Sequence, residues 1–263
     1  MELLRRRQCL LWMPALCFAG YVHAEVRDLP DAINKAGRLR MLSQRCAKAY
    51  LALGQKVRTE QAEKVLADSM ALFDRHLVEL RAYAHAAPIA KVYEQMDSSW
   101  SAFKLLLVGE RPSAKGADAV MAAATQVLAL AQQGTALLEQ SSGKPVGRLV
   151  NLAGRQRMLS QRMAATYLGA AWGVQADVLS RQLNQAREEF TQAQAVLKAA
   201  PETSAGLRSE LEMVDQQYVF FDAALRALKP GNTDTRSLSE VFTTSERILQ
   251  LMDEVTAQFA RLA

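Results

Sequence analysis

The stretch that decides the fold is Asn34-Lys-Ala-Gly-Arg-Leu-Arg-Met-Leu-Ser-Gln-Arg45, because the chain contains it twice. It returns 117 positions later as Asn151-Leu-Ala-Gly-Arg-Gln-Arg-Met-Leu-Ser-Gln-Arg162, with ten of the twelve residues identical and no gap. Similarity of a chain to itself at a fixed spacing is the signature of a repeated structural unit. We therefore expect two copies of one fold, each organised around this segment.

The same spacing relates large apolar residues well beyond the repeated segment. The aligned pairs are Tyr50 with Tyr167, Leu51 with Leu168, Leu66 with Leu183, Phe73 with Phe190, Leu80 with Leu197, Met96 with Met213 and Phe103 with Phe220. A unit of about 117 residues has the usual size of a domain. Residues 141–145, Ser-Ser-Gly-Lys-Pro, form the clearest break. We predict tandem units at residues 25–142 and 143–263.

Each unit is predicted to be an all-α, up-down-up-down four-helix bundle, because long amphipathic segments alternate with short loops. Half of the chain is hydrophobic and only 6% is aromatic, and no segment shows the period-two alternation of a strand. Gly54 is the predicted C-cap of the first helix. The expected helices are 30–53, 59–86, one that begins at 88, and 116–140, then 146–172, 174–200, 201–228 and 235–262.

The helix that carries the repeated segment has two nearly opposite faces suited to burial. One is apolar, with Leu39, Leu42 and Cys46, and the other runs from Ile33 to Leu51. A helix buried on two sides needs a second packing partner besides its own bundle. Either the two copies lie side by side and parallel, or the fourth helix runs end to end into the second unit. The sequence leaves both arrangements open.

In that second face an Arg and a Gln stand one turn apart, in both copies. A buried guanidinium without a partner costs several kcal/mol, and neither segment contains Asp or Glu. The counter-charge must come from another helix or from an anion, and a Gly one turn earlier lets a backbone or a small ligand approach. The alternative is close helix packing with structural ion pairs. The predicted ligand-binding residues are Gly37, Arg40, Gln44, Gly154, Arg157 and Gln161.

The first residues have the pattern of a secretory signal peptide. Arg5 to Arg7 are basic, an apolar run follows from Cys9 to Val22, and a small-x-small site precedes Glu25. We expect residues 1–24 to be removed and the protein to be periplasmic; the alternative is an uncleaved N-terminal membrane anchor. Cleavage would leave Cys46 as the one cysteine, so no intramolecular disulfide is expected.

Other functions find little support in the sequence. The net charge of +5 is not gathered in a basic face, so no nucleic-acid partner is expected. We find no nucleophile with a base, no phosphate loop and no metal-ligand spacing around His76 or His85, so we expect no enzyme, metal or cofactor. Four further arginines on the flank of the repeated helices are expected to be solvated or ion-paired: Arg38, Arg45, Arg155 and Arg162.

With Ile33 and Val150 in front, the two segments resemble the periplasmic P-box of the NarX/NarQ nitrate sensors. They are more similar to the PilJ-type domain of type IV pilus chemotaxis transducers, through the order Asn-x-Ala-Gly-x-x-Arg-Met. The resemblance implies a ligand-sensing helical bundle. It also implies that nitrate is held between two such helices, here by Gly37, Arg40, Gly154 and Arg157. The nitrate sensors tend to have Ser where this chain has an Arg after each Gly.

The resulting prediction is a periplasmic sensory or ligand-binding protein for a small oxyanion, nitrate or nitrite. It would act through a partner such as a membrane sensor or a transporter component. The alternative is a helical protein-interaction module of a pilus, chemotaxis or two-component pathway that has no small-molecule ligand. The sequence leaves the oligomeric state open, with a homo-oligomer among the options.

Overall fold

The computed structural model describes residues 25–143, 145–231 and 234–262, and every regular element within them is an α-helix, as predicted. The expected signal peptide lies outside the described residues. The helices are α1 (Leu29–Gly54), α2 (Thr59–Tyr83), α3 (Ala87–Val108), α4 (Ala114–Ser142), α5 (Pro145–Ala171), α6 (Ala176–Ala199), α7 (Ala205–Arg226) and α8 (Thr235–Leu262). None of these helices is long and apolar enough to cross a membrane.

Side-chain caps fix several helix starts. The carboxylate of Asp28 accepts from the backbone N–H of Asp31 at 2.8 Å and caps α1. Ser204 caps α7 in the same way, with its Oγ 3.2 Å from the backbone nitrogen of Leu207. The predicted start at 201 is therefore wrong, since residues 200–204 form the connection. The predicted start of α6 is two residues early because Gln175 has a left-handed backbone, with φ of 38°.

Gly54 is the last residue of α1 rather than its C-cap, which corrects the prediction. Its φ is not positive; the left-handed residues that follow are Lys56 and Arg58. A Cβ at Gly54 would lie 2.1 Å from the ring of Trp172, which follows α5. This glycine therefore makes room for the other unit instead of ending the helix.

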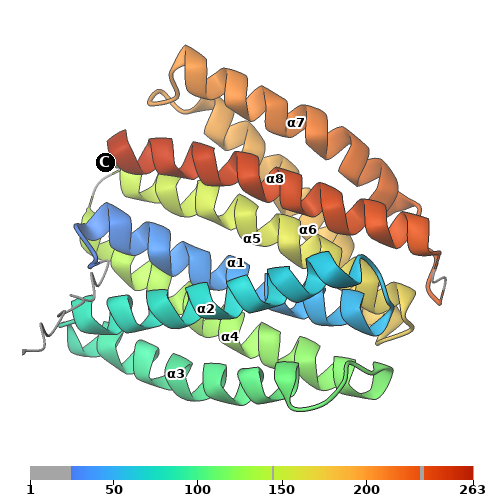
Figure 1. The fold of residues 1–263 in the computed structure, drawn as a ribbon. Coiled ribbons are helices and arrows are strands. Elements are labelled where there is room, and N and C mark those ends of the chain that lie inside the picture. The colour runs from blue at the N-terminus through green and yellow to red at the C-terminus, as the bar shows by residue number, and fades with distance from the viewer. Residues whose placement is uncertain (1–24, 144, 232–233, 263) are drawn as a thin grey trace, which may run out of the picture.

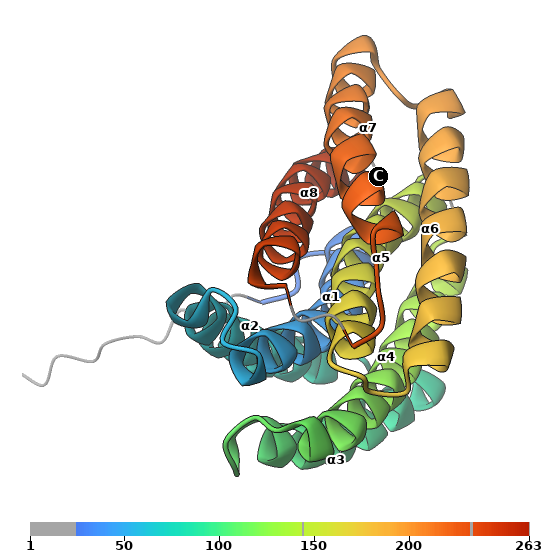
Figure 2. The same cartoon turned by 90° about the vertical axis from the view of Figure 1, so that its right-hand side faces the viewer.

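The two units lie side by side, with α1 and α5 parallel and in contact over their whole length (Figure 1). Gly147 lies against Ile33 at the start, Gly37 against Gly154 in the middle, and Gly54 against Trp172 at the end. Figure 2 shows α2, α3 and α4 on one side of this pair and α6, α7 and α8 on the other. The end-to-end arrangement is excluded.

Within each unit the first helix is the central one. α1 packs against α2 and α4, with α3 behind α4, and α5 packs in the same manner against α6 and α8, with α7 behind α8. Both predicted faces of α1 are buried, and its inward positions are fully buried from Ala32 to Ala52. Tyr50 and Cys46 are also buried. The doubled segment thus forms the centre of the molecule.

The repeat of 117 positions holds through the second helix of each unit and then changes. Phe73 and Phe190 are fully buried, and they stack on Trp100 and Tyr218 with ring centroids 3.9 and 4.4 Å apart. Trp100 and Tyr218 are 118 positions apart, so the second unit has gained one residue before α7. The predicted alignment of two α3–α7 pairs is consequently wrong: Met213 and Phe220 are exposed, while the buried counterparts are Val214 and Phe221.

Neighbouring phenylalanines test this register. Phe221→Ala should lower the free energy of unfolding by about 3 kcal/mol or more, because it opens a cavity in a packed core. Phe220→Ala should change it by no more than about 0.5 kcal/mol, because the ring is exposed. Urea unfolding followed by circular dichroism measures both. Equal losses, or the larger loss at position 220, would contradict the register.

Candidate functional site

The two repeated helices approach each other closely at Gly37 of α1 and Gly154 of α5. A Cβ on Gly37 would lie 3.9 Å from the Cα of Gly154, and the converse distance is also 3.9 Å. The same point beside Gly37 is 3.2 Å from Nη2 of Arg40 and 3.4 Å from Nη2 of Arg157. The glycines therefore leave space in which both guanidinium groups meet, and those groups fill it.

Arg40 is fully buried and has only neutral hydrogen-bond acceptors. Its Nη1 donates to Oε1 of Gln132 on α4 at 2.7 Å, and its Nη2 donates to the backbone oxygen of Asn151 on α5 at 3.1 Å. Its Nε has no partner among the described residues. Burial, reinforced by the nearby charge of Arg157, lowers the pKa of Arg40 to about 9. Among the residues that the structure describes, no carboxylate forms an ion pair with this arginine.

Arg157 is equally buried but has a carboxylate. Its Nη1 donates to Oδ1 of Asp253 on α8 at 2.6 Å. Its Nη2 donates to the backbone oxygen and to Oδ1 of Asn34 on α1, at 3.3 and 2.9 Å. Burial lowers the pKa of Arg157, and Asp253 opposes that change. The acidic partner that the repeated segment lacks is therefore supplied by the last helix of the same unit.

The two environments are related by a pseudo-twofold exchange of the units. Each arginine reaches a backbone carbonyl of the other unit, and each also reaches a fourth-helix side chain of its own unit. Those side chains, Gln132 and Asp253, are 121 positions apart, so the connection before α8 is longer than the one before α4. The sequence alone did not single them out because this shift hides their equivalence.

Of the six predicted residues, the two glycines and two arginines come together, and the two glutamines do not. Gln44 donates to the backbone oxygen of Ala124 on α4 at 3.2 Å, and Gln161 donates to that of Ser245 on α8 at 2.9 Å. Each glutamine thus ties the first helix of its unit to the fourth. They brace the helices that carry Arg40 and Arg157.

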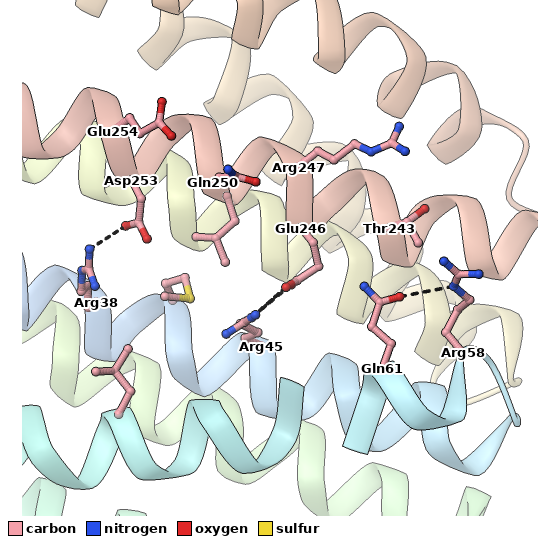
Figure 3. Close-up of a pocket in the computed structure, with 13 residues that line it drawn as sticks. Arg38, Arg45, Arg58, Gln61, Thr243, Glu246, Arg247, Gln250, Asp253 and Glu254 are labelled. Atoms are coloured by element: carbon pink, nitrogen blue, oxygen red, sulfur yellow. Dashed lines mark hydrogen bonds and ion pairs between the residues drawn. The ribbon is translucent and has the colours of Figure 1, made fainter. Parts of the chain in front are cut away.

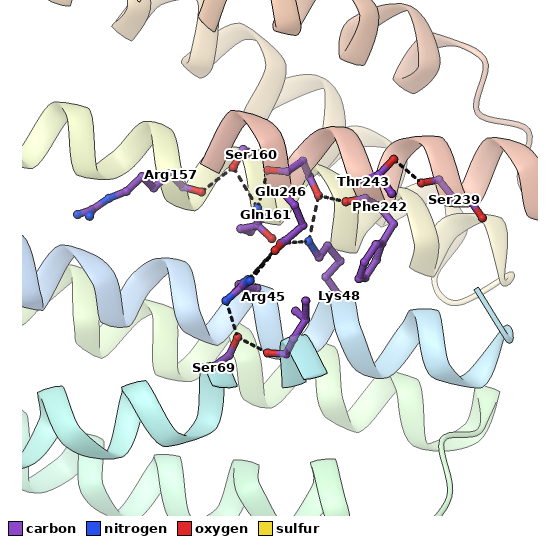
Figure 4. A network of polar contacts seen from close by, with 12 residues as sticks. Arg45, Lys48, Ser69, Arg157, Ser160, Gln161, Ser239, Phe242, Thr243 and Glu246 are labelled. Atoms are coloured by element: carbon purple, nitrogen blue, oxygen red, sulfur yellow. Dashed lines mark hydrogen bonds and ion pairs between the residues drawn. The ribbon is translucent and has the colours of Figure 1, made fainter. Parts of the chain in front are cut away.

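A second buried cluster exists on one side only (Figure 4). Lys48 is fully buried on α1, and its Nζ lies 2.5 Å from Glu246 and 3.0 Å from Oγ of Ser245, both on α8. Glu246 also accepts from Nε and Nη2 of Arg45, at 3.1 and 2.5 Å. Burial lowers the pKa of Lys48 to about 8, while Lys48 and Arg45 outweigh burial and lower that of Glu246 to about 2. This cluster joins the two units.

The sequence carried a signal for this cluster that the prediction did not use. The residue of α5 equivalent to Lys48 is Ala165, and the residue of α4 equivalent to Glu246 is Thr125. A buried helix face with a lysine in one unit and an alanine in the other indicates that the lysine has an acidic partner that only its own copy needs.

The flanking arginines mostly form ion pairs, as expected. Arg38 lies 3.2 Å from Asp253, and Arg155 lies 2.8 Å from Glu189. Arg162 is half-buried, and burial lowers its pKa. No group of His, Cys, Asp and Glu within the described parts of the chain could hold a metal ion.

The fold and the site thus define a tandem helical module. Its two units lie side by side, and buried arginines of α1 and α5 fill the interface between them. A family model described as "Type IV pili methyl-accepting chemotaxis transducer N-term", PilJ, matches residues 24–136 and 136–218. The chain belongs to this family. Searches of curated proteins and of solved structures give no match. The NarX/NarQ part of the resemblance receives no support, whereas the PilJ part is confirmed as two adjacent copies.

The Glu246 cluster predicts an acid-sensitive contribution to stability. Because the folded pKa of Glu246 is depressed, its contribution is present above the unfolded value near 4.5 and is lost as the pH falls toward about 2. Glu246→Gln should lower the free energy of unfolding by about 3 kcal/mol at pH 6, since Lys48 loses its counter-ion. The difference from the parent should shrink between pH 4.5 and 2.

Denaturant unfolding at a series of pH values measures this difference. Glu240→Gln, an exposed change on the same helix, is the control and should follow the parent throughout. A Glu246→Gln deficit that is the same at pH 6 and pH 3 would refute the ionic account.

Proposed function

We propose that this protein is a non-enzymatic, periplasmic signalling module of the pilus chemotaxis type, which works through contact with a protein partner. The proposal includes a cleaved signal peptide at residues 1–24 and the unit boundaries 25–142 and 143–263. The observation that carries it is the pair of adjacent matches to the N-terminal domain of pilus chemotaxis transducers.

The contact between α1 and α5 is filled by the side chains of Arg40 and Arg157. This filling favours a function through a partner protein over one through a ligand enclosed between the units. Where Gly37 of α1 faces Gly154 of α5, guanidinium groups occupy the space beside the two glycines. Arg157 is neutralised by Asp253 within the molecule. A module with a closed centre presents its outer helices, and helical faces of this kind bind other helices.

This function predicts a direct complex with a transducer. The mature chain should bind the purified periplasmic region of a PilJ-family transducer from the same organism, saturably and with a defined stoichiometry. Biolayer interferometry measures the binding, and the same region after heat unfolding is the control. A transducer that shows no binding at high micromolar concentration would contradict the proposed partner.

A second candidate function is oxyanion binding at the paired arginines, and Arg40 favours it. Within the described parts of the chain, Arg40 is fully buried and has neutral partners only, and its Nε, like that of Arg157, has no partner. An anion that displaced Gln132 would supply the missing charge through charge-assisted hydrogen bonds. Nitrate and nitrite are the proposed ligands, with Gly37 and Gly154 leaving the required space.

This candidate predicts unequal roles for the two arginines. Nitrate or nitrite should bind the parent protein in titration calorimetry. Arg40→Gln should weaken binding about tenfold or more, given the strength of hydrogen bonds to charged groups. Arg157→Gln should weaken it less, because Asp253 already neutralises Arg157. No heat from either anion in a folded sample would eliminate oxyanion binding at this site.

A further inference from the structure

The acids packed against α1 differ in how completely they are paired. In the groove between α1 and α8, Asp253 pairs with Arg38 and Glu246 pairs with Arg45 (Figure 3). On α2, Glu79 is buried more deeply, with its side chain only 4% exposed. Its Oε1 is buried and has no hydrogen-bond partner among the described residues. A buried acceptor without a donor is costly, so this oxygen calls for one.

The residues that lead into α1 are held beside this acid. Nζ of Lys35 donates to the backbone oxygen of Glu25 at 3.2 Å and lies 2.9 Å from Oε2 of Glu79, so one ammonium group contacts both. Nδ1 of His76 lies 3.3 Å from the same Oε2. Val26 is buried in the core. The backbone of Glu25 is therefore fixed next to Glu79, on the side whose second oxygen is unused.

Glu25 and Glu79 also line one hollow of about 400 Å³. The other described residues of its wall are Val26, Val78, Ala82, Tyr83 and His85. This wall contains two carboxylates and, among the residues that the structure describes, no lysine or arginine. The hollow therefore favours a positively charged group, because opposite charges attract most strongly where water is excluded.

The second unit has no counterpart of this acidic hollow. The residues 117 positions later are all apolar, and the pairs are Lys35 with Leu152, His76 with Ala193, Glu79 with Val196 and Tyr83 with Ala200. Val196 is 44% exposed, whereas Glu79 is buried. The acid is thus not required by the shared fold, and it belongs to the place where the chain enters α1.

Removal of the signal peptide would create the missing donor at this place. Cleavage after Ala24 turns the backbone nitrogen of Glu25 from an amide into an α-ammonium group, which carries a positive charge and three hydrogens. We propose that this α-ammonium group binds in the hollow and donates to Oε1 of Glu79. A charge-assisted hydrogen bond of this kind is stronger than one from a neutral amide.

This inference rests on the cleaved signal peptide that the proposed function includes, and it adds what cleavage does to the fold. The processed chain gains an ion pair that the precursor lacks. That ion pair anchors the start of α1, where Ile33 lies against Gly147 of α5. Processing would thus stabilise the end of the contact between the two units.

The test compares two forms of the full mature chain, one that begins at Glu25 and one that retains residues 22–24. Both are released from a fusion partner by a protease that leaves no extra residue. Thermal unfolding is followed by circular dichroism. The chain that begins at Glu25 should have a midpoint about 2–4 °C higher, as expected for one additional charge-assisted hydrogen bond in a chain of this size.

Substitutions in α2 assign that difference to one acid. Glu79→Gln should abolish it, because the amide has no charge to attract the ammonium group. Glu63→Gln, an exposed change on the same helix, is the control and should preserve it. Equal midpoints for the two parent forms, or a difference that persists in full with Glu79→Gln, would overturn the inference.

A labelling experiment on the parent chain covers the case in which Glu79→Gln does not fold. At pH 7 the α-amino group of Glu25 should react with an amine-reactive ester about tenfold more slowly in the folded chain than in urea, because Glu79 holds it in the unreactive ammonium form. Mass spectrometry of the N-terminal peptide measures both rates, and equal rates would refute the pairing.

The intact mass of the exported protein separates this inference from the proposed partner. A chain that begins at Glu25 supports the pairing, and any other first residue overturns it. Failure to bind a transducer would remove the proposed partner and leave the pairing in place.

Discussion

The close contact of α1 with α5 is the constraint on which the rest of the structure depends. At Gly37 and Gly154 neither helix has a side chain, and each sends a guanidinium across to a backbone carbonyl of the other. A charged donor that is fully buried must be satisfied where it lies. The two arginines therefore fix the register of the helices as well as their distance, and the remaining helices pack around the pair they form.

Duplication gave both units the same central helix, and their fourth helices then diverged. Arg40 meets the amide of Gln132, whereas Arg157 meets the carboxylate of Asp253. Glu246 likewise stands where α4 has Thr125, and it recruits two cations of the first unit. The charges of the second unit are thus arranged around the interface. One chain can hold two unequal versions of a contact that identical subunits would make equal.

The repeated segment predicted the architecture well, because periodicity and helix-breaking residues are local signals. The eight helices follow from these signals along the chain, and the two buried faces of α1 follow from the repeated segment. The meeting of Arg40 with Arg157 follows only for the side-by-side arrangement, one of the two that the sequence left open. The partners on α4 and α8 do not, since one inserted residue before α7 and three more before α8 shift the alignment. That shift also reversed the assignment of Phe220.

Some features of the site depend on contacts between units, and a sequence does not show these. Gly54 has the residue type of a helix cap, yet it is a glycine because Trp172 of the other unit lies against it. Gln44 and Arg40 share one face of α1 and both reach α4, but Arg40 also reaches α5 of the other unit. Spacing along a helix identifies the face, and the neighbouring helices decide what each side chain contacts.

The contact between α1 and α5 can be measured directly by a disulfide bond. Gly37→Cys and Gly154→Cys, combined with Cys46→Ser, place two thiols where the helices nearly touch, at a separation that a disulfide can span. The Nη2 atoms of Arg40 and Arg157, which lie 3.1 to 3.4 Å from the new Cβ positions, have to turn aside to admit them. After mild oxidation the account predicts a monomer that has lost two hydrogens by mass and migrates differently on a non-reducing gel. Free thiols in the folded protein, or disulfides that form only between chains, would contradict the side-by-side arrangement of the two units.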